Sequence, residues 1–207
     1  MKRLALLAVL AHLSIASANA QPADQPSADT GSDLIGAVCA QYAGVNVLQI
    51  DGHDRPMSCD IMRQTAAKMK RPTTLMNNVR EMLARQRIRL GEMKTASPDC
   101  KEVGKGARAT VTCPLPIPGA KGTITFIPDA EGYVNAFTTE LRDFHPLIMP
   151  AVAMMRRSMP TLSITEDGWR MLVDLMIANN NAIAPPDETY RRDGDAVKVE
   201  VMNIRKQ

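Results

Sequence analysis

The sequence predicts an α+β fold, in which an antiparallel sheet of four to six strands is covered on one face by helices and two disulfides close the chain. The first observation is a change of period: apolar residues recur every three or four positions through residues 57–94 and every second position after Ala96. The second is that Gly, Pro and Asp clusters separate the alternating segments, as turns do in an antiparallel meander. The third is an even number of cysteines, four, in a chain whose first residues indicate export.

Residues 1–20 have the three parts of a secretory signal peptide. Lys2 and Arg3 form a short positive region, residues 4–15 an apolar run, and Ala18-Asn19-Ala20 the small-x-small pattern that precedes a cleavage site. An uncleaved membrane anchor is the competing interpretation, but the apolar run is too short to span a bilayer comfortably. We therefore expect cleavage after Ala20, a periplasmic or secreted protein, and no transmembrane segment in the mature chain.

The mature chain is expected to begin with a disordered lead over residues 21–32, which contain no large apolar residue, and to continue as a single α+β domain over residues 33–207. Its charge is unevenly spread. Residues 57–94 carry nine basic and three acidic side chains, whereas residues 95–207 carry thirteen and fourteen. The positive field therefore belongs to one segment, and the chain lacks the overall basic excess of a dedicated nucleic-acid binder.

Capping residues and apolar spacing place the helices. Asp33 is an expected N-cap for a helix over residues 33–42, and Ser58 for a helix over residues 58–71. Pro72 must end or kink that second helix, and it suits the first turn of a third helix over residues 73–90, with Gly91 as the C-terminal cap. Later helices are expected at 146–159, which contains Pro150, and at 166–180, which carries Trp169 and follows a capping box at 163–166.

Segments of alternating polarity place the strands, and turn-forming clusters separate them. Strands are expected at residues 45–50, 100–103, 108–113, 123–127, 133–139 and 196–204. Residues 51–56 and 182–195 are expected to be loops. The buried side of the meander is expected to include the apolar residues Val111, Ile124, Phe126, Val134 and Ala136.

The four cysteines allow three pairings, and none of them lies in a C-x-x-C motif. The missing motif argues against a thioredoxin-like redox site and against a zinc site with paired ligands. Cys100 and Cys113 flank the turn signal Gly104-Lys105-Gly106, so a hairpin that turns there would place them opposite each other at bridging distance. Cys39 and Cys59 then pair by elimination.

Four arginines, Arg80, Arg85, Arg87 and Arg89, lie in the expected helix over residues 73–90 and mostly away from its apolar positions. They are the candidate binding residues. A solvated charged face is the plain interpretation, and recognition of an acidic protein, an anionic envelope component or nucleic acid is the functional one. Nucleic acid is disfavoured because no aromatic residue that could stack on bases lies among them.

His53 and His145 are the two histidines of the mature chain, and aspartates lie beside both. If the two segments converged, they could form an acid–base pair or a metal site. No fixed ligand spacing such as H-E-x-x-H accompanies them, so two loop histidines beside ordinary carboxylates are the favoured interpretation.

Methionine is the other candidate metal ligand, because thioethers suit Cu(I) and thirteen of the fourteen methionines follow the signal peptide. Met62, Met69 and Met76 recur every seven residues, a spacing of about 10 Å along a helix, which is too far for neighbours to share one ion. Core filling by methionine is therefore favoured in a chain with few aromatic residues, and no cofactor is expected.

Common catalytic signatures are absent from the sequence, which contains no G-x-S-x-G elbow, no Gly-rich phosphate loop and no S-x-x-K. A cysteine held in a disulfide cannot act as a nucleophile. The sequence therefore favours a non-enzymatic binding module, which uses its basic helical face to meet a protein or an anionic envelope component. The alternative is a small hydrolase or metal-dependent enzyme that uses His53 and His145 with the nearby aspartates.

Overall fold

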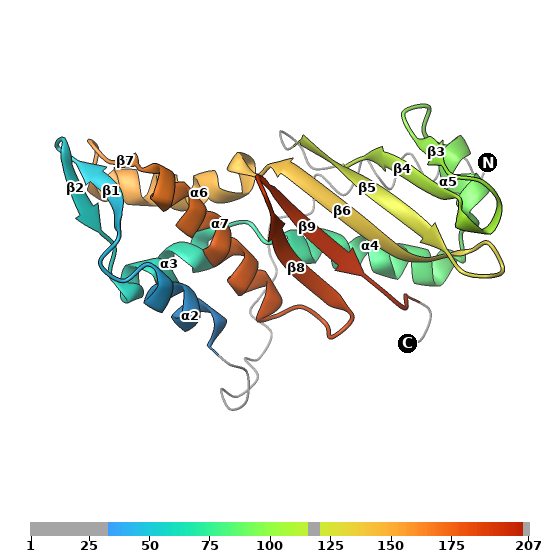
Figure 1. Ribbon diagram of the computed structural model, residues 1–207, viewed down its shortest axis with the longest axis horizontal. Helices are drawn as coiled ribbons and strands as arrows, with labels where there is room; N and C mark the ends of the chain where they lie inside the picture. Colours follow the sequence, from blue (N-terminus) through green and yellow to red (C-terminus); the bar gives the residue numbers. More distant parts are fainter. Residues whose placement is uncertain (1–32, 116–120, 205–207) are drawn as a thin grey trace.

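The computed structural model describes residues 33–115 and 121–204, so the expected signal peptide and lead lie outside the described residues. Figure 1 shows an elongated molecule with two parts. One part is a six-stranded sheet with the helix α4 (Pro72–Gln86) against one face, and the other part combines helices with a three-stranded sheet. The fold is α+β with antiparallel sheets and two disulfides, as the sequence predicts.

The elements follow one another along the chain with short connections. Besides α4, the helices of the described residues are α2 (Leu34–Gln41), α3 (Cys59–Lys68), α5 (Leu90–Ala96), α6 (His145–Ser158) and α7 (Glu166–Asn181), with a 3-10 turn η1 (Gly106–Arg108). The larger sheet has the order β3 (Lys101–Val103), β4 (Thr110–Pro114), β5 (Lys121–Pro128), β6 (Val134–Asp143), β9 (Ala196–Val201) and β8 (Glu188–Asp193). The smaller sheet has the order β2 (His53–Pro56), β1 (Asn46–Ile50) and β7 (Ser163–Ile164).

The core is one continuous cluster of buried side chains that runs through both parts. The five residues expected on the buried side of the meander, Val111, Ile124, Phe126, Val134 and Ala136, are all buried. Of the two consecutive helices that Pro72 separates, only α4 covers the larger sheet. Helix α3 packs against α6 and α7 instead, so it belongs to the helical part.

Helix α4 ends at Gln86, four residues earlier than expected, because Arg87 adopts a left-handed backbone (φ 46°). The chain then runs beside the segment that enters β6: Ile88 accepts a hydrogen bond from the Val134 N–H (3.0 Å), and Leu90 donates one to a neighbouring carbonyl. Ile88 and Leu90 are buried while Arg87 and Arg89 are exposed, a period of two that a helix cannot provide. Gly91, the expected cap, lies inside α5.

Two segments expected to be loops form hairpins instead. Residues 51–56 contain β2, which pairs with β1 across the turn Asp51-Gly52, where φ is 51° and 78°. Residues 182–195 contain β8, which pairs with β9 across the turn Gly194-Asp195. Asp-Gly and Gly-Asp both suit two-residue hairpin turns, because such turns require a left-handed backbone at one or both positions.

The expected capping box at 163–166 does not form, because its first two residues are strand β7. The N-cap of α7 is Thr165, whose hydroxyl accepts a hydrogen bond from the Gly168 N–H at 3.1 Å. A Cβ at position 168 would lie 2.0 Å from the carbonyl oxygen of Val47. Glycine at this position therefore lets the first turn of α7 press directly against β1.

Both disulfides join the cysteines that the sequence pairs. Cys39 in α2 bonds Cys59 at the start of α3, with 5.2 Å between the Cα atoms. Cys100 bonds Cys113 with 4.2 Å between the Cα atoms, because the antiparallel register of β3 and β4 places the two residues opposite each other. The first bond holds the helical part together and the second closes one edge of the larger sheet.

Three consecutive asparagines at the end of α7 each bond a different element. Asn179 donates its side-chain amide to a carbonyl of α3 (3.2 Å). The side-chain oxygen of Asn180 accepts hydrogen bonds from the N–H and the hydroxyl of Thr73 in α4 (3.2 and 2.6 Å). Asn181 bonds both the N–H and the C=O of Tyr190 in β8 (2.8 and 2.9 Å). The last turn of α7 therefore ties the helical part to the larger sheet.

Candidate functional site

Arg80, one of the four arginines expected on the binding face, is buried and only 5% exposed. One of its guanidinium nitrogens lies 2.7 Å from a carboxylate oxygen of Asp187 and 3.8 Å from one of Glu188. Arg80 therefore pairs α4 with the start of β8, and it does not share a surface with the other three arginines.

Glu188 is the most enclosed carboxylate of this cluster, with a side chain that is 0% exposed. One of its oxygens accepts a hydrogen bond from the Tyr190 hydroxyl at 2.5 Å, and the other has no hydrogen-bond partner among the described residues. Burial raises the pKa of Glu188, while the Tyr190 hydrogen bond and the charge of Arg80 act in the opposite direction. Burial also raises the pKa of Tyr190, and Glu188 adds to that shift.

Arg85, Arg87 and Arg89 remain exposed at the end of α4 and in the extended segment that follows it. The guanidinium carbons of Arg87 and Arg89 each lie 4.9 Å from the centre of the Tyr133 ring. Arg89 also donates a hydrogen bond to the Tyr133 hydroxyl at 3.3 Å. We call these four residues the arginine–tyrosine surface. Two of its three guanidinium groups are held by a single aromatic ring.

Acidic neighbours balance part of this positive charge. Arg85 pairs with Glu81 one turn earlier on α4 (3.0 Å), and both side chains are mostly exposed. Arg87 lies 3.8 Å from Glu131, also at the surface. Exposed pairs of this kind contribute little and leave the guanidinium groups accessible to water and to a partner.

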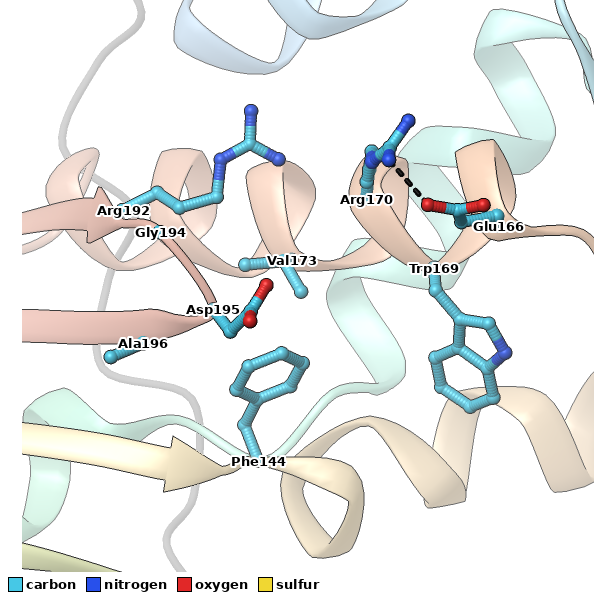
Figure 2. A pocket seen from close by; sticks show the side chains of 9 residues that line it. All are labelled: Phe144, Glu166, Trp169, Arg170, Val173, Arg192, Gly194, Asp195 and Ala196. Carbon is cyan, nitrogen blue, oxygen red and sulfur yellow. Dashed lines mark hydrogen bonds and ion pairs between the residues drawn. The ribbon is translucent and has the colours of Figure 1, made fainter.

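A pocket of about 380 Å³ lies where the two parts of the molecule meet (Figure 2). Its apolar lining is Phe144, from the junction of β6 and α6, Trp169 and Val173 from α7, and Ala196 from β9. Its polar lining is Glu166 and Arg170 from α7, and Arg192, Gly194 and Asp195 from the end of β8 and its turn into β9. In Figure 2 the two guanidinium groups lie on one side, the rings of Phe144 and Trp169 on the other, and the Asp195 carboxylate between them.

The charged groups of the pocket differ in how fully they are balanced. Arg170 pairs with both Glu166 and Asp167, so two carboxylates neutralise it. Arg192 pairs with Asp174 at 3.5 Å, outside the pocket lining. Asp195 makes no hydrogen bond and no ion pair with any residue that the structure describes. Asp195 therefore carries a negative charge that no described residue pairs with, and Arg192, which pairs with Asp174, keeps N–H donors that this single ion pair does not use.

Tyr42 fixes the carboxylate that holds Arg192. Its hydroxyl donates to Asp174 at 2.8 Å, and the Asp174 side chain is only 15% exposed. Removal from water, together with the Asp174 carboxylate, raises the pKa of Tyr42 to about 12. The contacts from Tyr42 to Asp174 and from Asp174 to Arg192 thus fix the position of the arginine side chain.

His145 lies beside the aromatic wall of the pocket. Its ring centre is 4.8 Å from that of Trp169 and 6.1 Å from that of Phe144. Its Nδ1 lies 3.1 Å from an oxygen of Asp143, and the hydrogen bond lowers the pKa of that carboxyl. The predicted histidine–aspartate pair therefore forms at this position.

The second histidine lies elsewhere. His53 begins β2, and Figure 1 shows β2 at one end of the molecule, whereas the junction of β6 and α6, where His145 begins its helix, lies near the middle. The structure does not bring the two histidines into one site. Within residues 33–115 and 121–204, no three His, Cys, Asp or Glu side chains lie close enough together to hold a metal ion. Met62, Met69 and Met76 are core residues, at most 4% exposed.

Sequence reasoning did not single out the residues that build the pocket. Trp169 was predicted only as part of a helix, and no role was predicted for Arg170, Arg192 or Asp195. One signal was present: Gly194-Asp195 is a two-residue turn sequence, which would have placed Arg192 and Asp195 at the end of a hairpin.

No helix of the part that the structure describes is long and apolar enough to cross a membrane. Comparison of the chain with protein-family models, with curated proteins and with solved structures finds no match. The functional assignment therefore rests on the geometry of the arginine–tyrosine surface and of the pocket.

Proposed function

We propose that the protein is an exported, non-enzymatic binding module that recognises an acidic protein of the cell envelope through Arg85, Arg87 and Arg89. The observation that carries this proposal is the stacking of Arg87 and Arg89 on Tyr133. The two disulfides support a destination outside the reducing cytoplasm.

The stacking matters because it orders two long side chains before a partner arrives. A free arginine loses about 2 kcal/mol of rotamer entropy when it is immobilised, and a pair already held by an aromatic ring loses less. A ring contacts the flat face of a guanidinium and leaves most of the N–H groups on its edge, which is the edge that binds a carboxylate in a fork.

The backbone supports the same arrangement. Arg87 and Arg89 flank Ile88, which is 3% exposed and anchored by a hydrogen bond from Val134. The arginines therefore project from a segment that is fastened to the larger sheet on its inner side. An acidic segment fits better than nucleic acid, because two guanidinium groups already lie over the ring of Tyr133, the one aromatic side chain of this surface on which a base could stack.

The test replaces Arg85, Arg87 and Arg89 together with glutamine and leaves the buried Arg80 in place. The matched control replaces three exposed arginines elsewhere, Arg55, Arg156 and Arg157, in the same way, so the net charge changes equally. Tagged wild-type and variant proteins are used to capture partners from an envelope extract at several salt concentrations. Any partner of the wild type and the control is expected to be missing from the first variant, and wild-type capture is expected to weaken as salt rises.

Equal capture by all three proteins would remove the arginine–tyrosine surface from the proposal. Export is tested separately by determining the N-terminal residue of the mature protein. Cleavage after Ala20 would make that residue Gln21.

A further inference from the structure

The pocket between α7 and the β8–β9 turn is independent of the arginine–tyrosine surface and has the size of a small-molecule site. Its volume, about 380 Å³, lies at the lower end of the range for pockets that hold one small ligand, about 300–1,000 Å³. Such sites combine an apolar wall with a few convergent polar groups. Here four apolar side chains form the wall, and the charged residues Arg192 and Asp195 lie on one hairpin.

Arg192 and Asp195 are close along the chain but do not form an ion pair with each other. Arg192 is the last-but-one residue of β8 and Asp195 the second residue of the turn. The guanidinium of Arg192 turns toward Asp174, which Tyr42 holds in place, and Asp195 is left without a partner among the described residues. One ion pair at 3.5 Å also leaves Arg192 with most of its five N–H donors for a second carboxylate.

These charges select the chemistry of a ligand. A simple anion would be repelled by Asp195. Arg170 would not compensate, because Glu166 and Asp167 already neutralise its charge. A simple cation would meet Arg192 instead. A molecule that carries both an ammonium and a carboxylate satisfies both groups and avoids burying either one unpaired.

The apolar wall selects the rest of the molecule. Phe144 and the half-buried Trp169 lie across the pocket from the arginines, and the buried Val173 lies between Arg192 and Phe144 (Figure 2). An aromatic or branched aliphatic group placed there would cover these side chains. We propose that this pocket binds a free α-amino acid with a large apolar side chain, its carboxylate on Arg192, its ammonium on Asp195 and its side chain against Phe144 and Trp169.

The protein contains its own reporter, because Trp169 is its single tryptophan. Saturable changes in its fluorescence, with calorimetry as an independent measure, would follow titration with L-phenylalanine and L-leucine. Two derivatives dissect the charges: N-acetyl-phenylalanine lacks the ammonium, and phenylalanine amide lacks the carboxylate. Wild type is expected to bind L-phenylalanine at least about tenfold more tightly than either derivative, since each derivative leaves Arg192 or Asp195 without the charged group that pairs with it.

Variants on the hairpin assign each preference to its residue. Asp195→Asn is expected to abolish the preference over N-acetyl-phenylalanine and keep the preference over the amide, and Arg192→Gln is expected to do the reverse. The matched controls are Asp193→Asn and Arg191→Gln, which remove the same charges from the same hairpin but do not line the pocket. Both controls are expected to bind as wild type does.

The proposal fails if neither amino acid produces a saturable signal by either method. It also fails if N-acetyl-phenylalanine or the amide binds as tightly as the free amino acid, or if the control variants change the preferences as much as the pocket variants. The outcome is separate from that of the partner-capture experiment, because the two sets of variants share no residue.

Discussion

Replacement of Arg80 by methionine tests whether the buried charge cluster holds α4 to β8. Arg80 and Glu188 have side chains that are 7% and 0% exposed, and a second carboxylate, Asp187, lies 2.7 Å from the guanidinium. Methionine fills much of the same volume but leaves Glu188 buried without a cation. Loss of one partner from a buried pair costs about 3–5 kcal/mol, and Glu188 can relieve part of that cost by taking up a proton, so we expect about 3 kcal/mol at neutral pH.

Urea unfolding followed by circular dichroism measures this loss. With a denaturant dependence of about 2 kcal/mol per molar, typical of a chain of this size, the midpoint should fall by about 1.5 M. Adding Glu188→Gln should recover about 1–2 kcal/mol, because the amide is neutral and its oxygen still accepts the Tyr190 hydroxyl.

The pH dependence gives a second reading of the same variant. The raised pKa of Glu188 means that its contribution to stability is complete below the unfolded pKa and is lost as pH rises through the folded pKa. Without Arg80 the pKa of Glu188 rises further, so the deficit of the methionine variant should be smaller at about pH 5 than at about pH 7.5. A variant as stable as wild type, or a double variant no more stable than the single one, would refute this account of the cluster.

Three further predictions concern the junction of the two parts. Asp174→Asn should lower the pKa of Tyr42 from about 12, measured by a tyrosinate absorbance titration. In wild type, the contribution of Tyr42 to folding stability is complete below its ordinary pKa of 10.0 and is lost as pH rises through about 12. An unchanged titration would contradict the hydrogen bond from Tyr42 to Asp174 as a cause of the shift. Gly168→Ala should destabilise by about 2 kcal/mol in urea unfolding despite its better helix propensity, because the Cβ would lie 2.0 Å from the Val47 carbonyl, and a higher midpoint would show that the contact is not tight. Asn181→Ala should cost about 1–3 kcal/mol and speed hydrogen exchange in β8 relative to β5, whereas equal exchange would mean that the amide does not protect this edge.

Local signals in the sequence were sufficient where a single element satisfies its own requirements. Asp33 and Ser58 are N-caps, and each accepts a hydrogen bond from the backbone three residues later. Cys100 and Cys113 pair because a hairpin register is set by the turn between them. The two hairpins that were not predicted also carry a local signal, the turn sequences Asp51-Gly52 and Gly194-Asp195.

The burial of Arg80 could be predicted only in part from the sequence. It lies four residues after Met76 and three before Leu83, so the helical period alone places it on the buried stripe of α4. Its charge argued for the surface, and Asp187, the nearer of the two carboxylates that permit its burial, lies 107 residues away in sequence. The pocket depends on tertiary structure in the same way, since Trp169 and Asp195 meet only after β8 and β9 have paired and α7 has packed beside them.

The three asparagines at the end of α7 have a consequence for the opening of the pocket. One wall of the pocket is the first half of α7 and the other is the far end of the β8 hairpin. Helix and hairpin are joined at two places: Arg192 pairs with Asp174 beside the pocket, and Asn181 bonds Tyr190 nearer the other end of both elements. The spacing of the two walls is therefore fixed on both sides of their contact. Two of the residues that set this spacing, Asp174 and Asn181, do not line the pocket, so substitutions there should change the width of its opening without removing any group that a ligand would touch.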